Sequence, residues 1–189
     1  SGPVGRVLAA HLYKSGHQVS VLCQFEDQKQ QLNKNPIVVS GALQAEEQLR
    51  NIYTGLEEML STKPDVVLIC TKNIDSAALL EDIKSLNPPD EMLFVSCQNG
   101  LDVEDQIVEL FGPGRALRMV LNMGCGMVNE SEIRVNFAMR HFISDVATVN
   151  SHLIQQIAWD LSSANFPTET DEFYRISVFK KALLNSSLG

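Results

Sequence analysis

An ammonium and a carboxamide share one face of the last expected helix. Lys181 and Asn185 are four residues apart, which places them on the same side of a helix. Together they could hold a 2-keto acid, and a lysine could protonate an oxygen while hydride arrives at the carbon. An ordinary solvated helix face is the alternative interpretation. Ile176, Phe179 and Leu183 lie on another face and are expected to pack inward.

The chain begins with a glycine-rich turn, Ser1-Gly2-Pro3-Val4-Gly5, that runs into an apolar helical pattern. With one further glycine in front it would be G-S-G-P-V-G, which opens a helix beneath a dinucleotide pyrophosphate. Gly2 would let the backbone approach the phosphates, and Gly5 would let the helix pack close to its strand. We expect that first glycine and the strand before it to be missing from the chain. A simple tight turn is the alternative.

The end of the next expected strand should indicate which ribose is bound. An acidic residue there suits the 2′-hydroxyl of NAD, and a basic residue suits the 2′-phosphate of NADP. Gln24 occupies this place and is neutral, so it favours neither cofactor. Lys29 and Lys34 are the nearest cations in sequence, and either could reach a phosphate.

Two more polar residues stand at the carboxyl ends of expected strands, where open α/β sheets bind their ligands. Lys72 could meet a phosphate, a ribose hydroxyl or a carboxylate, or it could be a surface lysine at a strand exit. Asn99 could offer its carboxamide beside a nicotinamide. It also begins an Asn-Gly dipeptide, which is typical of a turn with positive φ.

Strand and helix patterns alternate over the first two thirds of the chain. The expected helices span residues 3–15, 26–32, 56–60, 74–85 and 103–111. The expected strands span residues 17–24, 37–41, 48–53, 65–72, 91–99 and 116–122. This alternation predicts an α/β fold with a parallel sheet and right-handed crossovers. Further along we expect an antiparallel ribbon of 133–137 and 140–144, a helix at 150–165, a short connection at 167–171 and a helix from 172 onward.

The composition favours a globular protein that binds neither nucleic acid nor a membrane. A chain of 189 residues with 44% hydrophobic residues can form one domain and the beginning of another. Its net charge of −8 argues against a nucleic-acid or anionic-membrane surface. The four cysteines form no C-x-x-C pair, which favours a reducing, cytoplasmic compartment. No apolar run reaches the roughly 18 residues of a membrane span, and the histidines have no metal-ligand spacing.

Four motifs in the same order resemble those of the ketopantoate reductase (2-dehydropantoate 2-reductase) family. They are the glycine turn, Thr71-Lys72 at a strand end, Gln98-Asn99-Gly100-Leu101, and Phe179-x-Lys181-Ala182-Leu183-Leu184-Asn185. The resemblance implies a Rossmann-type domain over residues 1–168, with its first strand missing. Residues 169–189 would then be the first helix of an all-helical substrate and dimerisation domain.

The resemblance also implies a reaction, the reduction of 2-dehydropantoate to pantoate with NADPH in pantothenate and coenzyme A biosynthesis, with NAD as a possible cofactor. Lys181 would be the general acid, and Asn185 and Asn99 would bind the substrate. The implied cofactor contacts come from Gly2, Pro3, Val4, Gly5, Gln24, Lys72 and Asn99.

Two positions depart from the family pattern. Gln24 stands where the family commonly has an arginine for the 2′-phosphate, and Gly189 stands where it often has a second asparagine. Two alternatives therefore stay open: a related NAD(P)-dependent reductase of another small 2-keto or 3-hydroxy acid, and a non-catalytic dinucleotide-binding regulator. The expected partners are a small keto acid and, in the full-length protein, a second copy, with no nucleic acid and no membrane.

Overall fold

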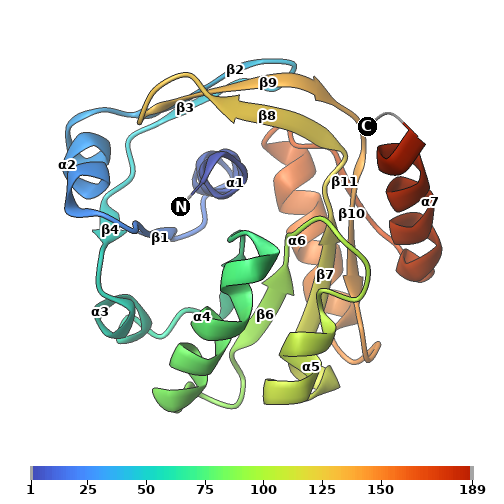
Figure 1. Cartoon of the computed structure of the whole chain (residues 1–189). Helices are drawn as coiled ribbons and strands as arrows, with labels where there is room; N and C mark the ends of the chain where they lie inside the picture. The colour runs from blue at the N-terminus through green and yellow to red at the C-terminus, as the bar shows by residue number, and fades with distance from the viewer. Residues whose placement is uncertain (1, 188–189) are drawn as a thin grey trace. The chain divides into compact units, whose positions relative to one another are not determined.

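The computed structural model describes the backbone of residues 2–187 and the side chains of residues 2–183 (Figure 1). The chain divides into two compact units, each assembled from separate stretches. Unit 1 comprises Ser1–Pro64, Asn122–Arg140 and Trp159–Pro167. Unit 2 comprises Asp65–Leu121, His141–Ala158 and Thr168–Gly189. The domain boundary expected at residue 168 stays a prediction.

Unit 1 is built around its first helix. Its elements are α1 (Pro3–Lys14), β1 (Ser20–Leu22), α2 (Glu26–Lys34), β2 (Ile37–Gly41), β3 (Ala45–Glu47), β4 (Asn51–Tyr53), α3 (Leu56–Leu60), β8 (Met123–Met127) and β9 (Glu132–Ala138). β1 and β4 form a parallel pair, and a second sheet has the order β3-β2-β9-β8. This second sheet lies over α1 (Figure 1). Its inward residues and the apolar face of α1 therefore form one core.

Unit 2 holds a five-stranded sheet of order β11-β10-β7-β6-β5. Its elements are β5 (Val66–Ile69), α4 (Asn73–Ser85), β6 (Leu93–Ser96), α5 (Asp105–Phe111), a short 3₁₀ helix η1 (Pro113–Arg115), β7 (Ala116–Val120), β10 (His141–Asp145), β11 (Thr168–Thr170) and α7 (Tyr174–Ser187). Helix α6 (Ser151–Ser163) contributes to both units. β5, β6 and β7 run parallel, and every residue of β6 and β7 is buried, as in a sheet covered on both faces. The predicted α/β fold with its parallel sheet is confirmed.

The expected antiparallel ribbon is wrong. β9 pairs with β8 and β2, whereas β10 pairs with β7 and β11. The apolar alternation identified two strands correctly, but it carries no information about their partners. Beyond β9, the N–H of Met139 donates to the carbonyl of Asn122 at 2.8 Å rather than closing a hairpin onto β10. β8 was not expected, and the connection at 167–171 contains the short strand β11.

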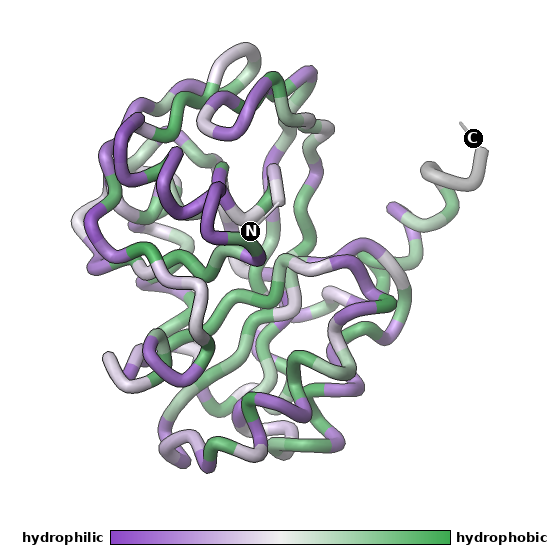
Figure 2. Tube along the Cα trace, turned by 60° about the vertical axis from the view of Figure 1, so that its left-hand side comes forward, coloured by the Kyte–Doolittle hydropathy of each residue, from purple (hydrophilic) through white to green (hydrophobic). Residues whose placement is uncertain are grey.

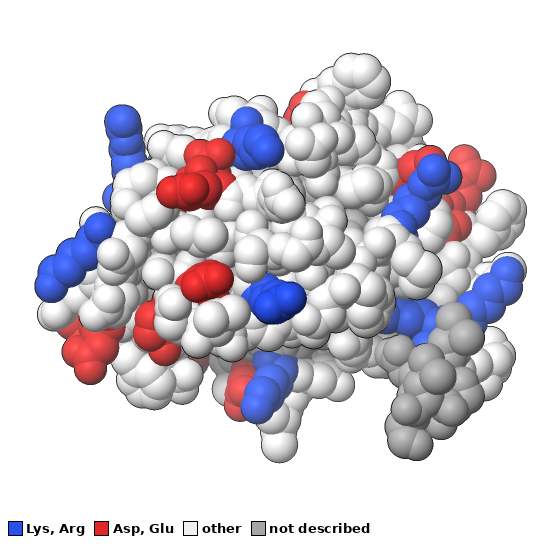
Figure 3. All heavy atoms as spheres, turned by 90° about the horizontal axis from the view of Figure 1, so that it is seen from above, with Lys and Arg blue, Asp and Glu red and all other residues white. Residues whose placement is uncertain are grey.

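Hydrophobic and hydrophilic segments follow one another along the chain. Hydrophobic stretches of the Cα trace alternate with hydrophilic ones (Figure 2), because buried strands alternate with amphipathic helices. The outer face of the β3-β2-β9-β8 sheet carries scattered charges of both signs among uncharged side chains (Figure 3). Among the described residues, no helix is both long enough and apolar enough to cross a bilayer.

Candidate active site

The start of α1, in unit 1, is open to an anion. Gly2 is the N-cap, with an extended backbone (φ −83°, ψ −173°), and Pro3 follows at the first helical position. No described side chain caps this end, and the first turn contains no acidic residue. A Cβ added at Gly2 would meet nothing within 4 Å. The unpaired N–H groups after Pro3, including those of Val4 and Gly5, therefore remain open to a phosphate, and these residues fit a dinucleotide pyrophosphate.

Two buried polar side chains anchor α1 within unit 1. The guanidinium of Arg6, 1% exposed, donates to the backbone carbonyl of Glu130 and lies 3.1 Å from its carboxylate. Nδ1 of His11 lies 2.9 Å from the carbonyl oxygen of Ala164, and its ring packs 5.2 Å from that of Phe166. Burial lowers the pKa of His11, so the ring is held in its neutral form. These contacts fix the helix that carries the glycine turn, and the sequence pattern did not point to them.

Gln24 follows β1 and is exposed. Its backbone N–H donates to the side-chain oxygen of Gln28 at 3.2 Å. The hydroxyl of Thr54, which follows β4, donates to the carboxylate of Glu26 at 3.2 Å. The carboxyl ends of this strand pair therefore present a neutral amide and a carboxylate, and the nearby cation Lys29 lies on α2.

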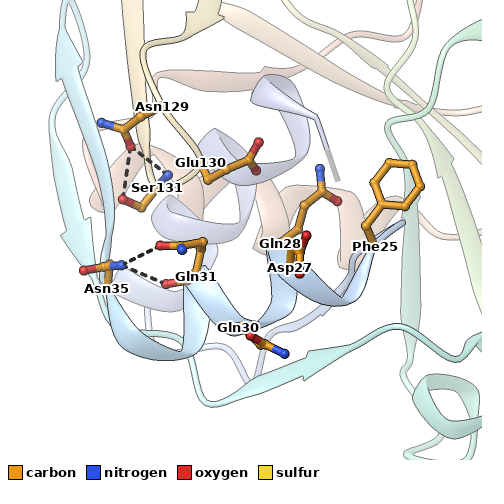
Figure 4. A pocket seen from close by; sticks show the side chains of 9 residues that line it. All are labelled: Phe25, Asp27, Gln28, Gln30, Gln31, Asn35, Asn129, Glu130 and Ser131. Atoms are coloured by element: carbon orange, nitrogen blue, oxygen red, sulfur yellow. Dashed lines mark hydrogen bonds between the residues drawn. The ribbon is translucent and has the colours of Figure 1, made fainter.

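A polar hollow of about 810 Å³ lies between α2 and the turn at residues 129–131 (Figure 4). Two pairs of its side chains are hydrogen-bonded to each other: the amide of Asn35 donates to Gln31, and the hydroxyl of Ser131 donates to Asn129. Glu130, which holds Arg6, also lines it. None of the predicted site residues with described side chains lines this hollow, and it supplies no candidate chemistry.

In unit 2, the ends of β5 and β6 carry Lys72 and Asn99. Lys72 is exposed at the N-cap of α4. Asn99 is exposed three residues beyond the end of β6. Between them, the buried amide of Gln98 donates to the carbonyl of Thr71 at 3.0 Å. This bond ties the two strand ends together, at the sheet edge where the sequence predicts ligand binding.

Lys181 reaches the same turn from α7. Its Nζ donates to Oδ1 of Asn99 at 2.7 Å and to the carbonyl of Leu121. Burial, and secondarily the positive charge of Arg118, lower the pKa of Lys181 to about 8. The structure thus brings together the expected acid and one of the two expected substrate-binding asparagines. Asn185 lies in α7, but its side chain is outside the described residues.

The inward face of α7 differs from the expected one. Tyr174 and Val178 pack with Val120 of β7, and Lys181 follows them at helical spacing on the same side. Ile176, Phe179 and Leu183, expected to pack inward, are more than half exposed, at 55%, 54% and 55%. The apolar residues on α7 form two stripes, so hydrophobicity alone does not indicate which one meets the sheet.

Arg118 is a site neighbour that the sequence prediction missed. It lies in the centre of β7 and is 2% exposed. It donates to Oγ of Ser96 at 3.0 Å and to the carbonyl of Gly100 at 3.1 Å, and it lies 3.6 Å from the buried carboxylate of Glu104. A charged residue within the apolar run A-L-R-M-V was the available signal, because a buried charge requires polar partners.

Comparison with known proteins identifies the family of this chain. Residues 1–147 match the family model of ketopantoate reductase PanE/ApbA. The chain is 22% identical over 193 residues to the 2-dehydropantoate 2-reductase of Aquifex aeolicus (strain VF5), covering 100% of this chain and 59% of that protein. The match to the family model spans more than half of this chain.

Solved structures show the same fold. The 2-dehydropantoate 2-reductase of Methylococcus capsulatus superposes with a TM-score of 0.84 at 20% identity, covering 98% of this chain and 59% of that one. A D-mandelate dehydrogenase solved with NADH and anilino(oxo)acetate has a TM-score of 0.80 at 17% identity, covering 97% and 59%. This chain spans about 59% of the length of these relatives. It belongs to the ketopantoate reductase family and has that family's Rossmann-like fold.

Proposed function

We propose that the protein carrying this chain reduces a small 2-keto acid with a nicotinamide dinucleotide, and that 2-dehydropantoate is its substrate and NADPH its cofactor. Membership of the family supports the reaction class. The names of the relatives from Aquifex aeolicus and Methylococcus capsulatus support the substrate. The product would be pantoate.

The roles follow from the chemistry of each group. The N–H groups at the start of α1, together with Gln24 and Lys72, would hold the cofactor, which when bound supplies hydride to the carbonyl carbon. Lys181 would donate a proton from Nζ to the carbonyl oxygen, giving the 2-hydroxy acid, and would regain a proton from water. Asn99 would hold the ammonium in place and, with Asn185, bind the polar groups of the substrate.

One observation carries the proposal: the 2.7 Å hydrogen bond between Lys181 and Asn99, with the pKa of Lys181 lowered to about 8. A lysine of ordinary pKa is a weak acid. One that titrates near 8 is still protonated at neutral pH and gives up its proton more readily. An ordinary solvated lysine would have neither the short bond nor the lowered pKa.

The test follows the oxidation of NADPH, and separately of NADH, with 2-dehydropantoate as substrate. Lys181→Met should abolish most turnover and leave cofactor binding intact. Lys180→Met is the matched control, because its neighbouring ammonium is exposed. Equal turnover in Lys181→Met and wild type would remove Lys181 from the mechanism. Cofactor binding without turnover of any keto acid would favour a non-catalytic regulator instead.

A second substrate class belongs in the same assay. The structural similarity to a D-mandelate dehydrogenase, with a TM-score of 0.80, suggests testing the 2-keto acid that corresponds to mandelate. Faster turnover of that aromatic keto acid than of 2-dehydropantoate would reassign the substrate but keep the reaction. Comparing NADPH with NADH would establish the cofactor preference that the neutral Gln24 leaves undecided.

A further inference from the structure

We propose that Arg118 is a positioning residue for Lys181: it fixes the turn that carries Asn99 and places a permanent positive charge near the ammonium. The inference rests on the proposed function for its catalytic meaning. Its structural content, that Arg118 sets the position and the proton affinity of Lys181, can be measured without turnover.

The guanidinium of Arg118 grips the Asn99 turn at two points. Ser96, three residues before Asn99, accepts a hydrogen bond on its hydroxyl at 3.0 Å. Gly100, one residue after Asn99, accepts one on its carbonyl at 3.1 Å. Because both hydrogen bonds come from one rigid, planar guanidinium, the backbone between Ser96 and Gly100 is held at both ends. The carboxamide that bonds Lys181 therefore starts from a fixed backbone.

Two further hydrogen bonds connect Arg118, through Ser96 and Gln98, to the end of the neighbouring strand β5. The hydroxyl of Ser96 lies 3.4 Å from the side-chain oxygen of Gln98, whose nitrogen donates to the carbonyl of Thr71 at 3.0 Å. Ser96 is fully buried and Gln98 is 7% exposed, so these bonds are shielded from water. Arg118 thus connects to both strand ends, and so to the backbone next to Lys72.

A buried carboxylate compensates the charge of Arg118. Besides Lys181, the ionisable groups that face it are Glu104 at the start of α5, Cys97 after β6 and Tyr174 of α7. Glu104 and Arg118 are each 2% exposed, with side chains 3.6 Å apart, so each compensates the buried charge of the other. Burial raises the pKa of Tyr174, and a hydrogen bond with Cys70, then burial, raise that of Cys97, which leaves both neutral at physiological pH.

Arg118 also acts on Lys181 through its charge. A fixed positive charge nearby disfavours the protonated ammonium, and it adds to the larger effect of burial. The result is a lysine that donates its proton more readily than an exposed one. Position and acidity would therefore both depend on one arginine that does not itself contact substrate.

The direct test measures the pH dependence of Lys181 acylation by a trace amount of a lysine-directed reagent, resolved by peptide mass spectrometry. In wild type the midpoint is expected near pH 8. In Arg118→Met it should rise, but stay below the ordinary lysine value of 10.5 because burial remains the larger cause. Arg115→Met is the matched control, since Arg115 also bonds two backbone carbonyls, those of Met92 and Pro89.

Measuring kcat beside the acylation midpoint separates the effect of the Arg118 hydrogen bonds from the effect of its charge. Arg118→Lys keeps a positive charge but loses the planar fork, so the midpoint should stay near the wild-type value. Its kcat should fall by roughly 10- to 100-fold, because the Asn99 turn is no longer held at both ends. A purely structural role would instead lower the amount of folded protein and leave the kcat of the folded fraction unchanged.

Folding is controlled with a second variant. Arg118→Met leaves Glu104 buried and unpaired, whereas Arg118→Met/Glu104→Gln removes both charges. A wild-type midpoint in folded Arg118→Met, or a double variant with the same midpoint as Glu104→Gln alone, would overturn the inference. If Arg118→Met raises the acylation midpoint of Lys181 but the wild-type protein turns over no keto acid, the inference is supported and the proposed function is contradicted. The two failures are therefore distinguishable.

Discussion

Nζ of Lys181 donates to Oδ1 of Asn99 at 2.7 Å across 82 residues of sequence. The lysine comes from α7 and the asparagine from the turn after β6, two elements held in the same compact unit. Because a hydrogen bond to the ammonium favours its protonated form, a change of charge at residue 99 should shift the pKa of Lys181.

A carboxylate in place of Asn99 should raise the pKa of Lys181. In wild type, kcat for keto acid reduction should fall above about pH 8, tenfold per pH unit, as the ammonium loses its proton. Asn99→Asp stabilises the ammonium, so the fall should begin at higher pH, and the weaker acid should lower kcat on the plateau. The pH profile of kcat measures both effects. Asn99→Ser is the uncharged control, and a profile for Asn99→Asp that superposes on it would contradict the prediction.

Removing the ammonium of Lys181 should stabilise the protein while it inactivates the enzyme. The folded pKa of about 8 lies below the unfolded value of 10.5, so the unfolded state binds more protons between these pH values. The cost is therefore complete below pH 8 and is relieved as the pH rises toward 10.5. Solvent screening of the half-buried group reduces the gain in Lys181→Met at pH 7 to on the order of 1 kcal/mol.

Urea unfolding of Lys181→Met at pH 7 and at pH 10 measures this gain, which should shrink at the higher pH. Lys180→Met, at an exposed position, should change stability by less than about 0.5 kcal/mol at either pH. A Lys181→Met protein less stable than wild type at pH 7 would mean that the hydrogen bonds to Asn99 and Leu121 outweigh the burial cost.

An aspartate at Gly2 should move stability and cofactor binding in opposite directions. Gly2 is the N-cap of α1, its extended backbone suits any residue, and a side chain there meets nothing within 4 Å. Aspartate is a better N-cap than glycine, so the helix should gain a few tenths of a kcal/mol. Its carboxylate would occupy the proposed pyrophosphate site and repel the phosphates, weakening NADPH and NADH binding by at least about tenfold.

Fluorescence titration with each cofactor measures that loss. Gly2→Asn has the same size and also caps the helix, but it carries no charge. Weaker binding in the aspartate variant than in the asparagine variant isolates the electrostatic part. Unchanged affinity in Gly2→Asp would place the cofactor phosphates somewhere other than the start of α1.

Gly41 and Gly16 form a matched pair for testing the β2–β9 pairing. Both have φ +95°, so alanine is strained at either position. At Gly16 a Cβ meets nothing within 4 Å, and the cost should be the backbone strain of about 1–2 kcal/mol. At Gly41 it would lie 2.2 Å from the carbonyl oxygen of Val135, which must move. Gly41→Ala should therefore cost at least about 2 kcal/mol more in urea unfolding, and equal losses would contradict the close approach of the two strands.

Local pattern was enough to predict most elements of this protein. The strand at Ile37–Gly41 and the helix at Leu56–Leu60 occur with the expected bounds, and α1 differs from its expected range by one residue. Apolar spacing, glycines and prolines specify these elements because their cause is contained within a few neighbouring residues. The order of the motifs was likewise enough to indicate the family.

Which distant segments pair or pack against each other could be seen only in the tertiary structure. The sequence could not tell that β9 and β10 join different sheets, that Tyr174 and Val178 face β7, or that Arg118 holds the turn that carries Asn99. Each of these depends on which surfaces meet after the chain folds, and the spacing of residues along one segment carries no record of its partner. The half-buried ammonium of Lys181 is the clearest case, because its pKa near 8 arises from burial, and secondarily from the charge of Arg118 on β7, rather than from its own helix.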